Sequence, residues 1–482
     1  MDNEYKAAKE AFVSGLTGST VTQVALVSAI APASMAASRV IHGFLARRRE
    51  RRGAPRWTTM QTAIFEYFTT VLPCLLAFTR TDWAVYLLLL LLLGAVIAVR
   101  LDRAYVLLRS RLACHTDHWR PVHRLVAPLR PASLQLLGAP RKPFVSLYRS
   151  TMMVATCTAI LAVDFPVFPR SYAKTETFGT SMMDVGVGSF LLSNALVFNT
   201  KGGGRAGGLL AFLKGLLPLL CLGIGRLVMV KASNYQEHVS EYGMHWNFFF
   251  TLLVVMLLFR LLPPLAPALI GPAGVLVVVL YQLVLSGGVF GASLSDYIVR
   301  EERTDWFFDM NREGIASSFG YLSLFMLGVA IGHLLLKNRA GASASSWYLA
   351  WAWLVVLAVA GYGALAYVEA AIQPVSRRMA NLPYVLFVFA YNMQQLASFL
   401  FIDLFLPPGG GVIATAINKH PLATFLAANI LTGTVNGMMQ TIYASTATSL
   451  AVLAVYTFAV SVGVVGLVQL TGGMQAAPKR IA

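Results

Sequence analysis

Long apolar segments constrain the fold of this chain more than any other feature. Of its 482 residues, 57% are apolar and only 12% are charged, and the mean hydropathy is +0.66. Apolar runs of roughly 17–25 residues can cross the bilayer core as helices, and we expect about thirteen of them. They lie at residues 22–44, 63–80, 83–99, 148–164, 184–200, 209–230, 246–262, 267–290, 314–336, 347–370, 383–406, 420–439 and 448–470. The composition predicts an all-α, polytopic transmembrane helical bundle that forms a single domain over residues 1–482.

The Lys and Arg residues predict the orientation of this bundle. The connections at 39–57 and 100–150, with the others on the same side, hold roughly 26 of the 38 basic residues. The positive-inside rule then places the N-terminus in the lumen and the C-terminus in the cytoplasm. The net charge of +17 reflects this topology and attraction to anionic lipid, or attraction of a phosphate-bearing substrate such as coenzyme A. The basic residues are not interleaved with stacking aromatics, which argues against a nucleic-acid partner.

Residues 162–190, AVDFPVFPRSYAKTETFGTSMMDVGVGSF, gather charges between two apolar segments. Pro166 and Pro169 stop any helix from running through. Ionisable side chains and irregular backbone are costly at the membrane and persist only against protein or a wet cavity. Asp164 and Lys174 are either an ion pair that orders this loop or a catalytic pair tuned by desolvation.

Three more polar clusters lie on the predicted lumenal side. The cluster at 235–247, YQEHVSEYGMHWN, contains four ionisable residues: Glu237, His238, Glu241 and His245. It could bind a divalent metal, but the HExxH order is absent, which favours a hydrogen-bonded interfacial cluster. The four cysteines are scattered without a CxxC pair, so we expect neither a disulfide nor a metal.

The other two clusters each enter a predicted helix, at 309–314 (DMNREG) and 375–384 (VSRRMANLPY). Asp309 or Asn311 could cap a helix or bind a ligand. Arg377 and Arg378 could be anchors that snorkel to the interface, or phosphate ligands.

These strings resemble the signature segments of the inositol acyltransferases of GPI-anchor biosynthesis, the PIG-W family. The likeness extends to the opening KEAFVSGLTGST and covers nearly the whole chain. It implies transfer of a fatty acyl group, usually palmitoyl from acyl-CoA, to the inositol 2-hydroxyl of glucosaminyl-phosphatidylinositol. It also implies a multi-pass protein of the endoplasmic reticulum membrane, with acyl-CoA as co-substrate and no tightly bound cofactor. In that family the acidic residue of the DFP segment and the following lysine are associated with catalysis, and they match Asp164 and Lys174.

Acyl transfer to an alcohol requires a base for the hydroxyl, stabilisation of the oxyanion and exclusion of water. We expect Asp164 to act as the general base and Lys174 to stabilise the oxyanion or orient Asp164. No GxSxG elbow is present, so direct transfer is favoured over an acyl-enzyme. The residues expected to hold the head group are Arg170, Glu237, His238, Glu241, His245, Asn311, Arg312, Arg377, Arg378 and Asn381.

Acyl-CoA is made on the cytoplasmic side, whereas Asp164 and Lys174 fall near the lumenal side of the predicted topology. Either coenzyme A enters through the bundle from the basic face, or the 164–184 loop re-enters the membrane. A secondary transporter is the rival class, but the charges gather at one interface and no inverted repeat appears. Other rivals are a histidine-dependent membrane O-acyltransferase and a lipid-binding scaffold. The sequence does not predict the oligomeric state.

Overall fold

The structure is a computed structural model that describes residues 3–113, 137, 142–198, 208–233, 239–287, 293–300, 302–337, 343–406 and 411–472. The described residues are mainly helical and form no strands, which confirms the predicted fold class. Within these ranges the only extended pairing is a pair of isolated bridges from Gly18 and Ser19 to Thr180.

The chain divides into two compact units, each described by itself. Unit 1 comprises the described residues of Met1–Val24, Arg170–Ala340 and Trp353–Gln394. Unit 2 comprises those of Ala25–Pro169, Gly341–Ala352 and Gln395–Ala482. The expectation of a single domain over 1–482 stays a prediction.

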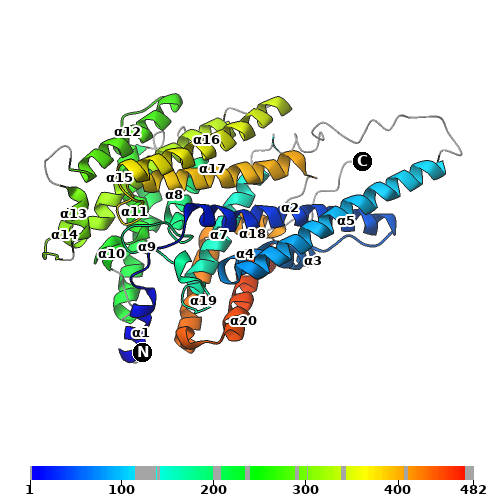
Figure 1. The fold of residues 1–482 in the computed structure, drawn as a ribbon, viewed down its shortest axis with the longest axis horizontal. Helices are drawn as coiled ribbons and strands as arrows, with labels where there is room; N and C mark the ends of the chain where they lie inside the picture. The colour runs from blue at the N-terminus through cyan, green and yellow to red at the C-terminus, as the bar shows by residue number, and fades with distance from the viewer. Residues whose placement is uncertain are drawn as a thin grey trace. The chain divides into compact units, whose positions relative to one another are not determined.

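Unit 1 is built mainly from nine α-helices (Figure 1). They are α1 (Asn3–Val13), α8 (Val185–Val197), α9 (Gly208–Ser233), α10 (Val239–Tyr242), α11 (Phe248–Leu261), α12 (Pro267–Leu285), α13 (Leu294–Val299), α14 (Phe307–Met310) and α15 (Arg312–Gly332). The 3-10 turn η2 (Arg170–Tyr172) and the π-helix η3 (His333–Lys337) also belong to it. Helix α15 packs against α8, α11 and α12, and most of its side chains are buried. A methyl group at Gly332 would collide with the backbone oxygen of Leu196, so glycine permits the close approach of α8 and α15.

Unit 2 contains a second set of helices. They are α3 (Thr59–Glu66), α4 (Leu72–Thr79), α5 (Thr81–Ala113), α7 (Pro143–Ala162), α18 (Val412–Lys419), α19 (Pro421–Met438), α20 (Thr446–Phe458) and α21 (Val464–Leu470), with the short turns η1 (Tyr67–Val71), η4 (Thr441–Tyr443) and η5 (Ala459–Gly463). Helix α7 packs against α4, α18, α19 and α20. Three further helices contribute residues to both units: α2 (Val21–Arg51), α16 (Ala344–Ala371) and α17 (Leu382–Phe405).

Ten helical segments in the described part of the chain are long and apolar enough to cross a membrane. Helices α8 and α11 are apolar but shorter, and the predicted span at 420–439 corresponds to α19. The protein is therefore a multi-pass membrane protein. The count of thirteen spans and the orientation of the termini stay predictions.

Two helices extend well beyond their predicted spans. Helix α2 continues to Arg51, where a break was expected after residue 44, and α5 continues to Ala113. Charge pairs support these polar extensions: Asp102 on α5 lies 3.1 Å from Arg47 and 2.9 Å from Arg51 on α2. Hydropathy detects only the apolar part of such helices.

The break predicted at Pro166 and Pro169 is confirmed. Helix α7 ends at Ala162, and α8 begins only at Val185. Between them, η2 is the only helical turn. The segment is divided between the units, because Pro169 ends a part of unit 2 and Arg170 begins a part of unit 1.

Candidate functional site

Backbone hydrogen bonds hold the 174–184 loop against two other segments of unit 1. The N–H of Glu176 donates to Leu16 O at 3.0 Å, and the N–H of Ser19 donates to Thr180 O at 2.6 Å. On the other side, the N–H of Gly179 donates to Val375 O at 2.8 Å. The loop thus lies between the N-terminal segment and the segment that leads to Arg377. Its irregular backbone is supported by protein, as the membrane setting requires.

Lys174 and Glu241 form the accessible end of an ion-pair network. The Nζ atom of Lys174 lies 2.7 Å from Oε1 and 2.9 Å from Oε2 of Glu241. The side chain of Lys174 is 40% exposed and that of Glu241 is 17% exposed. A lysine ammonium has three N–H donors, and both contacts go to one carboxylate. At least one donor therefore remains for another acceptor.

Arg377 continues this network into the protein interior. Its Nη1 lies 3.4 Å from Glu241 Oε1, and its Nε lies 2.9 Å from Asp184 Oδ1. Asp184 is fully buried, and it also accepts hydrogen bonds from the backbone N–H of Thr175 at 3.2 Å and from its hydroxyl at 2.9 Å. The charges therefore alternate from Lys174 through Glu241 and Arg377 to Asp184. We call these four residues the loop network.

The loop network shifts the pKa values of its members. Burial acts to raise the pKa of Glu241, but Lys174 and Arg377 outweigh it, and the pKa is lowered to about 2. Burial lowers the pKa of Lys174 despite the opposing effect of Glu241. Burial acts to lower the pKa of Arg377, but Glu241 and Asp184 outweigh it and hold the pKa above its usual value. Glu241 is therefore ionised at neutral pH.

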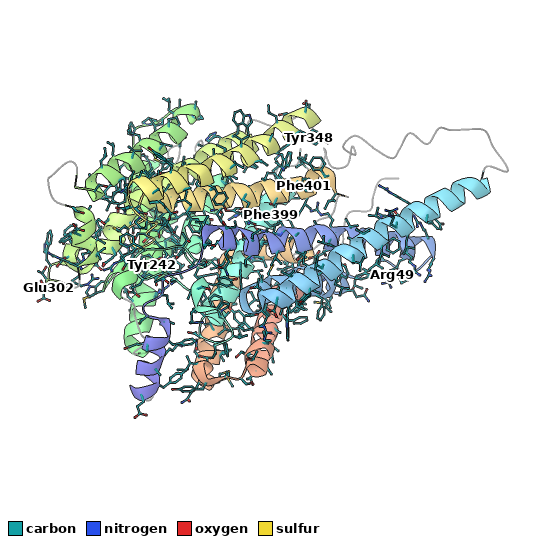
Figure 2. All side chains as sticks on the ribbon, in the orientation of Figure 1. Arg49, Tyr242, Glu302, Tyr348, Phe399 and Phe401 are labelled. Atoms are coloured by element: carbon teal, nitrogen blue, oxygen red, sulfur yellow. The ribbon has the colours of Figure 1, made fainter. Side chains whose placement is uncertain are left out.

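Two tyrosines lie beside the loop network. Tyr242, which Figure 2 labels, follows Glu241 on α10. Its side chain is buried. Burial raises the pKa of its phenol well above the usual value, so the side chain is neutral. Tyr384 donates a 2.9 Å hydrogen bond to the backbone oxygen of Asp184. Tyr242 thus adjoins the Glu241 end of the network, and Tyr384 adjoins the Asp184 end.

A second charged network joins the last two polar clusters. Glu313 is fully buried and accepts hydrogen bonds from Arg303 at 2.6 Å and from Arg378 at 2.8 Å. Asp309 accepts from Arg312 at 2.9 Å and from the backbone N–H of Thr304 at 2.6 Å. The hydrogen bond from Thr304 opposes burial and lowers the pKa of Asp309 far below its usual value. This network fastens residues 302–313 to the segment that carries Arg378.

Arg377 and Arg378 are buried, so the snorkelling alternative is wrong. Each instead pairs with a buried carboxylate, Arg377 with Asp184 and Arg378 with Glu313. A guanidinium drawn from water is stable only with such partners. Their role as phosphate ligands stays a prediction.

Asn311 and Asn381 are buried and bind backbone groups. The side-chain oxygen of Asn311 accepts from the N–H of His245 at 2.9 Å, and its amide donates to Phe307 O at 2.8 Å. Asn311 occupies the N-cap position of α15, but its side chain makes no capping hydrogen bond. Asn381 accepts from the N–H groups of Ser376 and Tyr384 and so fixes the turn before α17. Both residues shape the site from within.

Asp164 has its own setting in unit 2. It lies two residues beyond α7, is 5% exposed, and accepts a 2.7 Å hydrogen bond from the amide of Asn436 near the end of α19. Thr441 in turn donates to the Asn436 oxygen at 3.3 Å, which orients this amide. Asp164 and Lys174 belong to different units, so the expected pairing of the two stays a prediction.

The remaining predicted residues are less informative. The guanidinium of Arg170 lies 4.0 Å from the ring centre of Phe12 and makes a cation–π contact. Glu237 and His238 lie outside the described residues. Among the residues that the structure describes, no three His, Cys, Asp or Glu side chains gather as a metal site.

Several important residues were missed because no motif marks them. Asp184 and Glu313 lie inside the quoted strings without a motif of their own, and Asn436 lies in a segment that contains no charged residue. The sequence holds no signal that singles out Asp184, because its partner Arg377 is 193 residues away. Asn436 is one of several polar residues of its span, so the sequence does not single it out either.

The two settings are suited to acyl transfer. In unit 1, the partly exposed ammonium of Lys174 has an N–H donor that does not contact Glu241, and the ionised carboxylate of Glu241 holds the ammonium in place. In unit 2, a nearly buried carboxylate is oriented by an amide, which suits a general base.

Comparison with known proteins identifies relatives along nearly the whole chain. A family model described as GWT1 matches residues 5–467. The GPI-anchored wall transfer protein 1 of Aspergillus fumigatus is 36% identical over 513 residues, which cover 95% of this chain and 96% of that protein. The phosphatidylinositol-glycan biosynthesis class W protein of Dictyostelium discoideum is 33% identical over 505 residues, which cover 95% of this chain and 96% of that protein. The wall transfer protein of Eremothecium gossypii is 36% identical over 499 residues, with 94% and 95% covered.

Proposed function

This chain belongs to the GWT1 family, as its motifs predicted, and from that premise we propose that it acylates inositol in GPI-anchor biosynthesis. The acceptor is glucosaminyl-phosphatidylinositol and the position is the inositol 2-hydroxyl. The observation that carries this proposal is the similarity to proteins named for GPI-anchored wall transfer and phosphatidylinositol-glycan biosynthesis over about 95% of the chain. The ten apolar helices fit an enzyme whose acceptor is a membrane lipid.

The donor in this proposal is acyl-CoA, with palmitoyl as the acyl group, and the compartment is the endoplasmic reticulum membrane. The inositol oxygen attacks the thioester carbonyl, an ester C–O bond forms and the C–S bond to coenzyme A breaks. The hydroxyl proton passes to a base and then to the departing thiolate. Direct transfer of this kind needs no nucleophilic serine or cysteine.

Asp164 is the general base in this proposal. Its carboxylate is nearly buried, which excludes water from the proton transfer, and the hydrogen bond from Asn436 fixes its orientation. Asn436 is then a positioning residue that acts through Asp164.

Lys174 stabilises the oxyanion of the tetrahedral intermediate. The donor left over from its contacts with Glu241 supplies this interaction, and Glu241 holds the ammonium in place. A preorganised cation costs no reorganisation when the charge develops. Arg170, Arg312, Arg377, Arg378, His245, Asn311 and Asn381 shape the head-group site, most of them through the contacts described above.

The test uses purified full-length protein with glucosaminyl-phosphatidylinositol and radiolabelled palmitoyl-CoA. We expect a palmitoylated inositol lipid and stoichiometric release of coenzyme A. An analogue with the inositol 2-hydroxyl replaced by a methoxy group should accept no acyl group. Equal acylation of this analogue, or no transfer to the natural lipid, would overturn the proposal.

A further inference from the structure

Arg226 is an exposed arginine on the apolar helix α9. It lies within the segment Gly208–Val228, which is apolar enough to span a membrane. It makes no hydrogen bond or ion pair with any residue that the structure describes. An arginine near the end of an apolar helix, with no ion pair among the described residues, is costly in a membrane, and such residues often mark binding sites.

Arg226 lies close to the exposed end of the loop network. Asn247 donates a 3.0 Å hydrogen bond to the backbone oxygen of Gly223, which ties α9 to the start of α11. Gly223 is three residues, or about one helical turn, before Arg226. Glu241 lies on α10, six residues before Asn247. The charge of Arg226 acts on both Lys174 and Glu241.

The charges do not balance among the residues that the structure describes. Three cations, Lys174, Arg226 and Arg377, accompany two described carboxylates, Glu241 and Asp184. Arg377 already contacts both carboxylates and is buried. The excess charge therefore resides at the exposed end, on Arg226 and on the spare donor of Lys174.

We propose that Arg226 forms an anion subsite beside Lys174 that binds the phosphodiester of the inositol lipid acceptor. A planar guanidinium matches the geometry of a phosphate with two parallel N–H donors, and a single phosphodiester charge neutralises the excess. The phosphate of the acceptor is attached directly to the inositol ring. Binding it here would hold the ring within reach of Lys174, whose other role is at the oxyanion. This inference rests on the proposed function for the identity of the lipid.

The kinetic test compares wild type with Arg226→Gln and Arg226→Lys in nanodiscs of neutral phosphatidylcholine. We expect Arg226→Gln to raise the KM for glucosaminyl-phosphatidylinositol about tenfold or more, which is the loss of one charged hydrogen bond of about 1.4 kcal/mol. The KM for palmitoyl-CoA and the thermal midpoint should change little. The acceptor KM of Arg226→Lys should lie between those of wild type and Arg226→Gln. Arg260→Gln is the matched control, because Arg260 lies on α11 and its guanidinium contacts Phe212 instead. An unchanged acceptor KM in Arg226→Gln would overturn the subsite.

A binding test separates the substrate phosphate from bulk anionic lipid. Soluble glucosaminyl-inositol phosphate and glucosaminyl-inositol differ only in the phosphate. Wild type should bind the phosphate form at least about tenfold more tightly, and Arg226→Gln should lose this preference. The alternative is that Arg226 contacts only bulk anionic lipid. Wild type and Arg226→Gln will then each bind glucosaminyl-inositol phosphate and glucosaminyl-inositol with equal affinity. Only the addition of phosphatidylserine to the nanodiscs will then distinguish wild type from Arg226→Gln.

The outcomes also separate this inference from the proposed function. Should wild type bind the phosphate form through Arg226 and yet transfer no acyl group, this result would reject the proposed function and support the subsite. If wild type acylates the lipid and the Arg226 variants do so with the same KM for the acceptor, the result supports the proposed function and rejects the subsite.

Discussion

The ammonium of Lys174 lies 2.7 and 2.9 Å from the two carboxylate oxygens of Glu241, a residue 67 positions later in the chain. This contact changes the role that we assign to Glu241. Glu241 was expected to bind the head group, but its carboxylate is already engaged by Lys174 and Arg377. It is placed to orient Lys174, and contact with the lipid would be a second role.

Glu241→Gln should leave Lys174 without its counter-charge. Because the pair is only partly buried, we expect a loss of about 1–3 kcal/mol in the free energy of unfolding, between the values for exposed and buried pairs. Acyl transfer should fall at least about tenfold, because the ammonium is no longer held. Thermal unfolding and turnover in detergent measure the two effects. Asp305→Asn, at an exposed carboxylate outside the network, is the control; equal effects of the two substitutions would contradict the orienting role.

The pH dependence of stability should report Glu241 directly. Its pKa is about 2 in the folded protein and about 4.5 when unfolded, so its stabilisation is complete above about pH 4.5. That stabilisation is lost as the pH falls from about 4.5 toward 2. The thermal midpoint of wild type should therefore drop more steeply below pH 4.5 than that of Glu241→Gln. Parallel curves for the two proteins would contradict the lowered pKa.

Gly320→Ala tests the contact that places the Arg377 turn against α15. A methyl group at Gly320 would collide with the backbone of Ala380, which adopts a left-handed φ of 47°. Overpacking of this kind costs about 1–3 kcal/mol, more than the gain in helix propensity. The thermal midpoint should fall, and acyl transfer should fall with it. Gly215→Ala on α9 is the control, since no described atom lies within 4 Å of the added methyl group. A Gly320→Ala protein as stable as Gly215→Ala would disprove this close contact.

Asn436→Ala tests the orientation of Asp164. Removing the amide deletes a 2.7 Å hydrogen bond to the carboxylate. We expect kcat to fall about tenfold to a hundredfold, with little change in either KM or in the thermal midpoint. A purely structural role would instead lower the thermal midpoint and leave the kcat of the folded protein near the wild-type value.

The sequence predicted the elements well because apolar length and proline are local signals. Each predicted span has a helix, and α7 ends before Pro166 as expected. The true start of α3 depends on a capping box in which the Thr58 hydroxyl accepts from the N–H of Gln61, a feature that hydropathy does not register.

The pairing of the site residues was not predictable, because the partners are far apart in the chain. Arg377 meets Asp184 across 193 residues, and Asp164 meets Asn436 across 272. One sequence without aligned relatives contains no signal for such contacts. The motifs mark segments that carry these charges, but the packing of α8, α15 and α17 decides which charges meet.

The most direct test of the account is acyl transfer by purified Asp164→Asn, measured with glucosaminyl-phosphatidylinositol and palmitoyl-CoA. The substitution preserves shape and removes the base, so its thermal midpoint should stay close to that of wild type. The account predicts a fall in kcat of about a hundredfold to ten-thousandfold with both substrates still bound. A folded Asp164→Asn protein that transfers palmitate at more than half the wild-type rate would contradict it.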